Sequence, residues 1–436
     1  MKQRRFVLAH DSVPVVRVLA VFARLGGLLT ISAALLLAAC GGGGSSSGGS
    51  GGAIAPASPT NVLAVTVDAG PAALHAAGDA AVNTLFASVT ICTPGSATAC
   101  ETIDHMQVDT GSTGVRFLAA ALSGKAVPTA LNDAASGNPL RECVQFADGY
   151  VWGSLVSADI QLGSRTLSDI PVHILGDSNA GTPPASCVSG PEEDSIASFG
   201  ANGVIGIGNF RQDCGEACVA KAISATYYVC ANGACAPTTV PLQTQVGNPV
   251  AAMSSDNNGV MIDLPAVSAP GVSVNGNLYF GIGTESNNAL GSAAFLTLND
   301  TGALITNFGG SSLGSSIIDS GSNGYFFDAD SSATCSNFTS FYCPVNSAGA
   351  AISIDENASI QGMNGTTRSV SFTVDNADSL FRTDDAALPT LAGPNSTPNG
   401  PSNSFAWGLP FFYGRPMFVL LENATVSGVT GPAIAF

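Results

Sequence analysis

The sequence predicts an all-β protein built from two similar lobes, on three observations. The first is a repeat, because Met106–Phe117 and Ser316–Phe327 each place an aspartate between an apolar stretch and a Gly-Ser turn, 210 residues apart. The second is composition, since 51 Gly and 24 Pro punctuate short apolar runs, a pattern typical of packed sheets or barrels. The third is length, since about 375 residues follow the N-terminal segment and suit two lobes better than one domain.

The first 39 residues have the pattern of an export signal. Five Lys or Arg residues form a long basic region, and an apolar run follows at 28–39. This run is short for a membrane span and ends in small residues, so a cleaved signal is favoured over an uncleaved transmembrane anchor. Its end, Leu37–Cys40, resembles a bacterial lipobox, which implies that Cys40 is lipidated and begins the mature chain.

Residues 40–57 are expected to connect the lipid to the folded body. Residues 41–52 are Gly and Ser only, which predicts a flexible tether. Because Gly41 and not Asp follows Cys40, the lipobox resemblance implies the outer membrane of a bacterial cell envelope. Several acyl chains on Cys40 would give stable anchoring to that membrane.

The charge limits the possible partners. Cleavage of the signal would remove five cations and one anion and take the formal charge from −17 to −21. Phosphate repulsion therefore disfavours nucleic acid as a partner. Because no feature indicates an oligomer, a monomer is the default expectation.

The cysteines agree with export to an oxidising compartment. Ten remain besides Cys40, and an even number predicts disulfides. Two short bridges and one longer bridge are expected, namely Cys92–Cys100, Cys335–Cys343 and Cys143–Cys187. Four further cysteines can pair in sequential or nested order, or hold zinc at an unusual spacing: Cys214, Cys218, Cys230 and Cys235.

Short runs of apolar and β-branched residues predict strands along the body. Examples are Val62–Val67, Leu85–Ile91 and Ser369–Val374. Helical periodicity is scarce, and short helices are expected only at Val115–Leu122 and Glu216–Ser224.

Each aspartate motif has a second element downstream. Gly203–Gly208 and Phe405–Pro410 both contain two apolar residues followed by Gly, roughly 90 residues after their motif. Glycine permits close backbone approach, so a strand can pass tightly behind each Asp loop. We therefore expect an N-terminal lobe over 58–245 and a C-terminal lobe over 246–436, since Pro and Asn gather near this boundary.

These paired elements resemble the pepsin-like aspartic peptidases. The matching segments are Val108–Ser112 with Val204–Gly206, Ile318–Ser322 with Ala406–Gly408, Ser88–Pro94 before the first Asp, Val144–Gly153 as the flap hairpin, and Phe418–Ala424 as closing strands. The resemblance spans about residues 80–436 of the printed sequence. It implies two related β-barrel or sandwich lobes with an active-site cleft between them.

The resemblance also implies a catalytic pair, Asp109 and Asp319. Like charges held close cannot both ionise, so the two carboxyls would share a proton and activate a water. Either motif alone can equally be an ordinary Asx turn that closes a hairpin. No metal and no cofactor is required by this chemistry.

Six neighbouring residues would hold the two carboxylates in place. The residue after each Asp would bond the opposite lobe, each Gly would let backbone N–H groups reach the carboxylate, and each following Ser would bond its outer oxygen. They are Thr110, Gly111, Ser112, Ser320, Gly321 and Ser322.

The sequence departs from the family at the flap. The flap Tyr corresponds to Phe146 or, less naturally, to Tyr150, and the Trp that it bonds corresponds to Arg116, so that contact cannot form. Phe146 and Trp152 could serve the core or reach a ligand. Residues 41–115 contain no Lys or Arg, so that stretch holds no basic inhibitory pro-segment.

Two functions fit these observations. The first is an extracytoplasmic, membrane-anchored aspartic endopeptidase that acts on peptides or proteins, which the two intact motifs favour. The alternative is a pepsin-like surface lipoprotein that binds partners or has a structural role with little or no catalysis, which the altered flap favours.

Overall fold

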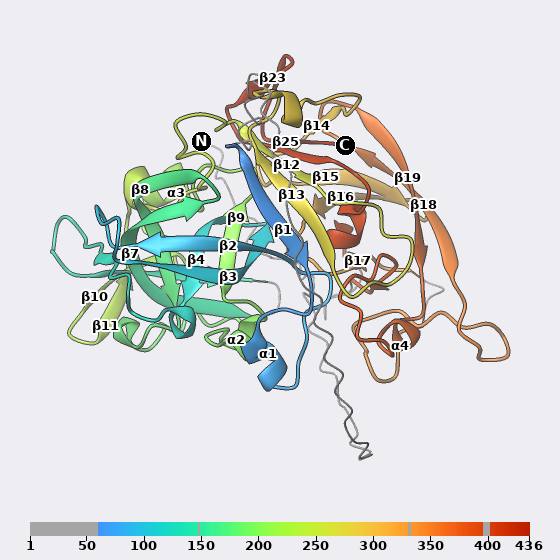
Figure 1. Cartoon of the computed structure of the whole chain (residues 1–436), viewed down its shortest axis with the longest axis horizontal. Coiled ribbons are helices and arrows are strands. Elements are labelled where there is room, and N and C mark those ends of the chain that lie inside the picture. Colours follow the sequence, from blue (N-terminus) through green and yellow to red (C-terminus); the bar gives the residue numbers. More distant parts are fainter. Residues whose placement is uncertain (1–59, 147–148, 330–332, 396–401) are drawn as a thin grey trace, which may run out of the picture.

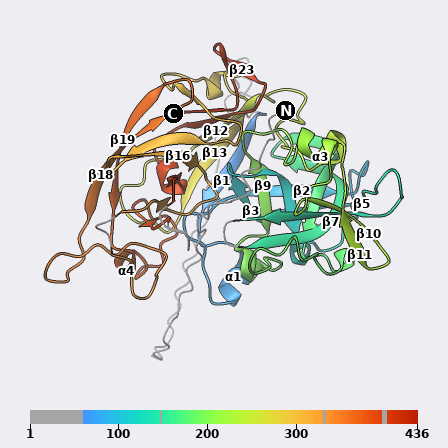
Figure 2. The ribbon, with the colours of Figure 1, turned by 180° about the vertical axis from the view of Figure 1, so that it is seen from behind.

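The structure, a computed structural model, describes residues 60–146, 149–329, 333–395 and 402–436 and is almost entirely β. The first half of the chain (blue to green) and the second half (yellow to red) form two lobes, with β1, β12 and β13 between them (Figures 1 and 2). The predicted all-β, bilobal fold is confirmed. The export signal, Cys40 and the whole tether fall outside the described residues.

The largest sheet has 16 strands and contains strands from both halves of the chain. Its members are β1 (Val62–Val67), β2 (Leu85–Cys92), β3 (Cys100–Asp109), β4 (Thr113–Leu118), β5 (Thr129–Ala130), β6 (Leu140–Gln145), β7 (Tyr150–Leu162), β8 (Arg165–Leu175), β9 (Gly203–Ile207), β10 (Tyr227–Ala231), β11 (Ala234–Pro237), β12 (Gly259–Asp263), β13 (Val274–Phe280), β14 (Phe295–Thr297), β22 (Met417–Leu420) and β25 (Ala433–Ala435). Strand β1 from the first half of the chain pairs with β13 from the second half. The expected lobe boundary at 245/246 stays a prediction.

The second sheet has seven strands and lies in the C-terminal lobe. Its members are β15 (Leu304–Phe308), β16 (Ser311–Ile318), β17 (Tyr325–Phe326), β18 (Ile354–Gln361), β19 (Thr367–Val374), β20 (Ala392–Gly393) and β21 (Ala406–Trp407), and β23 (Thr425–Val426) pairs with β24 (Val429–Thr430) separately. The short α-helices are α1 (Ala72–Ala76), α2 (Ile196–Phe199), α3 (Glu216–Ala220) and α4 (Ala377–Leu380). Among the described residues, no helix has the length and apolar character needed to cross a membrane.

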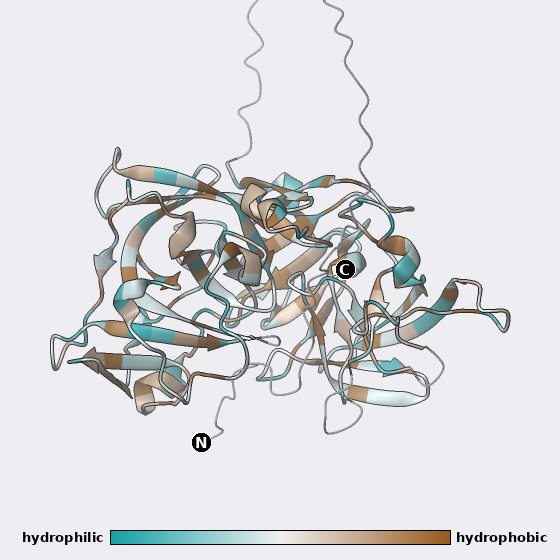
Figure 3. Ribbon diagram, turned by 90° about the horizontal axis from the view of Figure 1, so that it is seen from below, coloured by the Kyte–Doolittle hydropathy of each residue, from teal (hydrophilic) through white to brown (hydrophobic). Residues whose placement is uncertain are grey.

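Alternating side chains explain why these segments form sheets with one buried face. Along β19, Val370, Phe372 and Val374 are buried while their neighbours are more exposed. This period of two places one side of the strand in the core. Figure 3 shows brown and teal residues following one another along many strands.

The same strand arrangement brings each motif aspartate to the middle of the molecule. Strand β3, which ends at Asp109, pairs in parallel with β9, and β16, which ends just before Asp319, pairs in parallel with β21. Glycine is needed at both crossings, because a Cβ at Gly206 would lie 2.6 Å from the Thr113 nitrogen and one at Gly408 would lie 2.2 Å from the Gly324 oxygen. The expected strand behind each Asp loop is confirmed.

Aromatic packing stabilises the second of these contacts, between β21 and the Asp319 loop. The rings of Phe405 and Trp407 stack with centroids 4.0 Å apart, and the Trp407 indole N–H donates to the Thr306 hydroxyl at 3.0 Å. The Asp319 backbone N–H donates to the Trp407 carbonyl at 3.0 Å. The second Asp loop is therefore fixed to a buried aromatic core.

The sequence prediction of a helix at Val115–Leu122 is wrong. The first half of this segment belongs to β4, which pairs with β8 and β9, and only Ala119–Ala121 form a short 3₁₀ turn. Pairing within the sheet overrides the weak helical preference of the segment.

All ten described cysteines form disulfides. The three expected bridges are present, and the four remaining cysteines pair in sequential order: Cys92–Cys100, Cys143–Cys187, Cys214–Cys218, Cys230–Cys235 and Cys335–Cys343. The alternative of a zinc site in the four-cysteine cluster is therefore wrong, because bonded sulfurs cannot be zinc thiolates.

Candidate functional site

Both motif aspartates sit in the same local structure. Asp109 ends β3 and Asp319 follows β16, and each side chain is largely buried, with a relative exposure of 9%. The backbone N–H of Gly111 donates to Asp109 Oδ1 at 2.7 Å, and that of Gly321 donates to Asp319 Oδ1 at 2.8 Å. Each loop is thus an Asx turn, as either motif alone allows.

The two turns face each other across the junction of the lobes. The carboxyl of Asp319 lies close enough to Asp109 for its charge to raise the pKa of Asp109. A Cβ at Gly111 would lie 2.6 Å from Asp319 Oδ1, and a Cβ at Gly321 would lie 2.6 Å from Asp109 Oδ1. The Gln107 side-chain amide also donates to the Gly321 carbonyl at 3.1 Å. The absence of side chains on the two glycines is what lets the carboxyls meet.

The residues that follow the aspartates lock the two loops together. The Thr110 backbone N–H donates to Ser320 Oγ at 3.1 Å, and the Ser320 backbone N–H donates to Thr110 Oγ1 at 2.9 Å. The Thr110 hydroxyl donates to the Ile318 carbonyl at 3.4 Å, and the Ser320 hydroxyl donates to the Val108 carbonyl at 2.8 Å. These four bonds are symmetric, so they restrict motion of one loop relative to the other.

Electrostatics at the pair favour a shared proton. Burial raises the pKa of Asp109 well above its ordinary value, and the charge of Asp319 and the hydrogen bond to Asp319 raise it further. The Ser112 hydroxyl and the Gly111 N–H lower this pKa, but their effect is smaller. A carboxyl that keeps its proton beside a second carboxyl can donate to a ligand while its neighbour accepts.

The two following serines are not equivalent. The Ser322 hydroxyl donates to Asp319 Oδ2 at 2.8 Å, as expected. Ser112 is near enough to Asp109 to lower its pKa, but its buried Oγ has no hydrogen bond of standard geometry with any described residue. The two sides of the pair therefore differ, and the charged form of Asp319 receives one more donor.

The expected flap is a hairpin formed by β6 and β7. These strands pair from Arg141–Ser154 to Gln145–Tyr150, and the Phe146 N–H donates to the Gly149 carbonyl at 2.8 Å. The disulfide between Cys143 and Cys187 ties the hairpin to the neighbouring loop.

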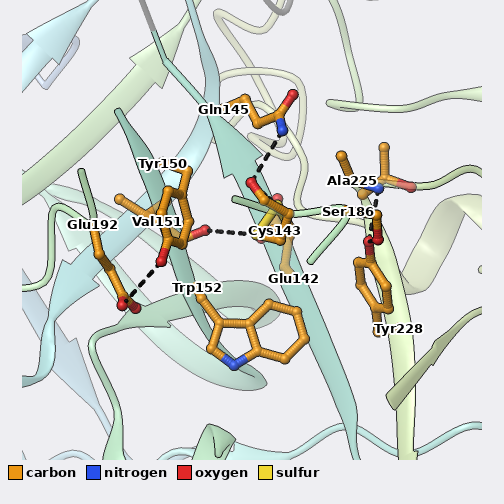
Figure 4. Close-up of a disulfide and its surroundings, with 12 residues drawn as sticks. Glu142, Cys143, Gln145, Tyr150, Val151, Trp152, Ser186, Glu192, Ala225 and Tyr228 are labelled. Carbon is orange, nitrogen blue, oxygen red and sulfur yellow. Dashed lines mark hydrogen bonds between the residues drawn. A yellow bond between two sulfur atoms is a disulfide. The ribbon is translucent and has the colours of Figure 1, made fainter. Parts of the chain in front are cut away.

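The three aromatic residues of the hairpin have different positions. Phe146 lines a pocket beside Thr110 and Gly111. Tyr150 and Trp152 do not line this pocket. The Tyr150 hydroxyl donates to Glu192 at 3.2 Å (Figure 4), and the Trp152 indole donates to the Gly181 carbonyl at 3.0 Å. Trp152, which is 2% exposed, belongs to the core, so its alternative role as a ligand contact is not supported.

The pocket next to the carboxyl pair has a volume of about 150 Å³. An apolar cavity of that size accepts a group as large as benzene. Apolar walls come from both lobes, through Phe146, Phe210, Ile317, Ile318 and Ile434. The pocket can therefore hold one apolar side chain within reach of the Asp109 loop.

One residue near the site was missed by sequence reasoning. Asn83 is 1% exposed, and its side-chain amide donates to the carbonyls of Asn323 and Leu388, both at 2.8 Å. Its Oδ1 accepts from the Leu388 N–H at 2.8 Å and from the Tyr413 hydroxyl at 2.9 Å. Asn83 thus joins the N-terminal lobe to the loop after Ser322, and an isolated Asn carries no sequence signal for this role.

Comparisons with known proteins agree with this geometry. The family described as "Protein of unknown function (DUF3443)" matches residues 57–436. No curated protein matches the sequence. Among solved structures, the crystal structure of an aspartic proteinase from Irpex lacteus is similar, with a TM-score of 0.50, 15% sequence identity, and coverage of 86% of this chain and 96% of that one. At this identity the similarity establishes a relation of fold.

Proposed function

We propose that this chain, which belongs to the DUF3443 family, is an aspartic endopeptidase that hydrolyses peptide bonds with a water activated by Asp109 and Asp319. The observation that carries the proposal is the pair of facing carboxyls, each packed against the glycine of the opposite loop and held by reciprocal bonds between Thr110 and Ser320. Two unrelated Asx turns would not be expected to bring their carboxyls together in a buried junction, each opposite the glycine of the other turn. The fold relation to an aspartic proteinase supports the same reaction class.

The two carboxyls would take different roles at the start of the reaction. Asp109, whose pKa is raised by burial, would hold the proton and donate it to the scissile carbonyl oxygen. Asp319, whose Oδ2 accepts from the Ser322 hydroxyl, would take a proton from the bound water. Attack of that water on the carbonyl carbon gives a tetrahedral diol. Its collapse breaks the C–N bond as the amine takes the proton held by Asp319 and one diol hydroxyl returns a proton to Asp109.

The substrate class follows from the pocket. A volume of about 150 Å³ beside the Asp109 loop accepts an apolar side chain, and Phe146 from the hairpin would cover it. Burial of such a side chain contributes about 1.5–3 kcal/mol to binding. We therefore expect cleavage of unfolded or extended peptides with apolar residues next to the bond.

The proposed location is the bacterial cell envelope, with the protein anchored to the outer membrane through lipid on Cys40. Five disulfides support an oxidising, extracytoplasmic compartment. The lipobox-like Leu37–Cys40 and the Gly/Ser segment after it support the anchor and the tether.

A peptide library tests the proposed reaction. Protein without its lipid is incubated with the library between about pH 3 and 7, the range in which paired carboxylates titrate. We expect cleavage that increases below neutral pH and is blocked by a pepstatin-like transition-state mimic. If no inhibitor-sensitive cleavage occurs, the alternative applies, in which the pepsin-like fold acts as a binding or structural module; the altered contact at Arg116 favours that alternative.

A further inference from the structure

A cluster of buried charges lies next to the pocket, in the N-terminal lobe. Four members lie on strands β4, β6, β8 and β10, namely Arg116, Glu142, His173 and Tyr227. The fifth, Asp213, lies in the loop after β9. Arg116, Glu142, His173 and Tyr227 are each at most 1% exposed. Burial of charged groups costs several kcal/mol per ion, so such a cluster rarely contributes stability alone. A specific structural role is therefore expected.

The guanidinium of Arg116 joins the aspartate loop to the flap hairpin. One of its nitrogens, Nη1, donates to the carbonyl of Thr113, the first residue of β4 after the Asp109 loop. The other, Nη2, donates to Glu142 Oε1 at 2.6 Å. Glu142 lies on β6, four residues before Phe146, which lines the pocket. The rigid fork of a guanidinium suits two acceptors in fixed directions.

The same guanidinium also holds the wall of the pocket. Arg116 Nη2 donates to Asp213 Oδ2 at 3.0 Å, and the Tyr227 hydroxyl donates to Asp213 Oδ1 at 2.6 Å. Both Arg116 and Asp213 line the pocket beside the carboxyl pair. One side chain therefore connects the three segments that surround the pocket in this lobe.

The charges within the cluster balance. Asp213 and Glu142 both accept from Arg116 Nη2, and burial, followed by the nearby Glu142, raises the pKa of Asp213 well above its ordinary value. The raised pKa favours a neutral Asp213, which lowers the negative charge that faces the guanidinium. His173 faces Glu142 at 3.0 Å, and burial lowers its pKa so that it stays neutral. Arg141, on the same strand as Glu142, bonds backbone carbonyls instead.

We propose that Arg116 is a positioning residue for substrate binding: through Thr113, Glu142 and Asp213 it holds the flap hairpin and the pocket wall at a fixed distance from the Asp109 loop. The expected effect of Arg116 on peptide cleavage rests on the proposed peptidase function. Its structural part, the attachment of the hairpin, can be measured without any activity.

The test uses the double variant Arg116→Met/Glu142→Gln. Arg116→Met alone leaves the buried Glu142 carboxyl without its guanidinium partner, which is strongly destabilising and can prevent folding. The double variant removes both charges and keeps the side-chain volumes. We expect it to raise KM for a cleaved peptide at least tenfold and to change kcat less than threefold, because the bonds at Asp109 and Asp319 are untouched. Amide hydrogen exchange over residues 140–155 should become faster.

Two controls separate positioning from stability and from charge. Arg141→Met removes a neighbouring buried Arg whose guanidinium donates to the carbonyls of Leu140 and Asn179, and its KM should stay within threefold of the wild type. Arg116→Lys keeps the charge but not the fork, so it should show the raised KM.

Each outcome decides one part of the inference. A folded double variant with wild-type KM overturns the positioning role, whatever its exchange rates. Unchanged exchange over 140–155 overturns the attachment of the hairpin. If the wild type itself cleaves no peptide, the proposed function fails, and the exchange experiment alone supports or overturns the role of Arg116 in holding the hairpin.

Discussion

Thr110 and Ser320 exchange hydrogen bonds across 210 residues of sequence, each donating its backbone N–H to the hydroxyl of the other. Ser320 is fully buried and Thr110 is 5% exposed. This reciprocal pair fixes the distance between the two aspartate loops, so it should contribute both to stability and to the geometry of the carboxyl pair.

Replacing Thr110 with Val tests that contribution. The side-chain shape is nearly kept, but the buried Ser320 N–H loses its acceptor, which should cost about 1–3 kcal/mol of unfolding free energy. Urea denaturation measures the change. Thr90→Val is the matched control, because the Thr90 hydroxyl bonds Thr102 in an exposed part of the sheet and its loss should cost less than about 0.5 kcal/mol. Equal effects of the two variants would contradict the account.

Gly111→Ala should disable the site through sterics. The new Cβ would lie 2.6 Å from Asp319 Oδ1, so one carboxyl must move away from the other. We expect a loss of peptide cleavage of at least about a hundredfold, since small displacements of catalytic groups have effects of that order. In Gly271→Ala, where nothing lies within 4 Å of the new Cβ, activity should be unchanged. Full activity in Gly111→Ala would show that the two carboxyls need not meet.

The pH dependence of stability should report the raised pKa of Asp109. Because this pKa is higher in the folded state, the contribution of Asp109 to stability is complete below the unfolded pKa of about 3.9 and is lost as the pH rises through the folded pKa. The wild type therefore carries a penalty at pH 7 that Asp109→Asn lacks.

Thermal unfolding at two pH values measures this penalty. We expect Asp109→Asn to melt a few degrees higher than the wild type at pH 7. The difference in Tm should shrink at pH 4, where Asp109 is more fully protonated in both the folded and the unfolded wild type. A difference in Tm that is the same at both pH values would contradict a raised pKa at Asp109.

Anchoring depends on one residue of the N-terminal segment. Cys40→Ser removes the only thiol of the lipobox-like sequence, so the variant should be released as soluble protein or accumulate as unprocessed precursor. Fractionation of cells with immunoblotting measures the distribution. Processed Cys40→Ser protein that still sediments with outer membranes would rule out the lipid anchor.

The sequence predicted much of the fold because the two halves repeat one local pattern. The Asp motifs, the glycine steps behind them and the disulfides Cys92–Cys100 and Cys335–Cys343 depend on residues that are close in sequence or aligned between halves. The pairing partners of each strand in the sheet could not be predicted in the same way. Val115–Leu122 looks helical in isolation, but its first residues pair with β8 and β9, and long-range pairing decides the outcome.

The supporting structure of the site was largely hidden in the sequence. Arg116 was recognised as a departure at the flap contact, yet its partners Glu142 and Asp213 are isolated acids far away in the chain. Asn83 and the difference between Ser112 and Ser322 also depend on tertiary contacts. Such contacts between single polar residues leave no period or motif, so only a structure reveals them.

The central claim is that Asp109 and Asp319 together activate water for peptide hydrolysis. The most direct measurement compares kcat/KM of the wild type with Asp109→Asn and Asp319→Asn on one cleaved peptide, with the exposed Asp384→Asn as the control. Loss of a general acid or base typically costs about 10²–10⁴-fold, so both dyad variants should lose at least a hundredfold while remaining folded and Asp384→Asn should keep full activity. Cleavage that persists at the wild-type rate in either dyad variant would contradict the account.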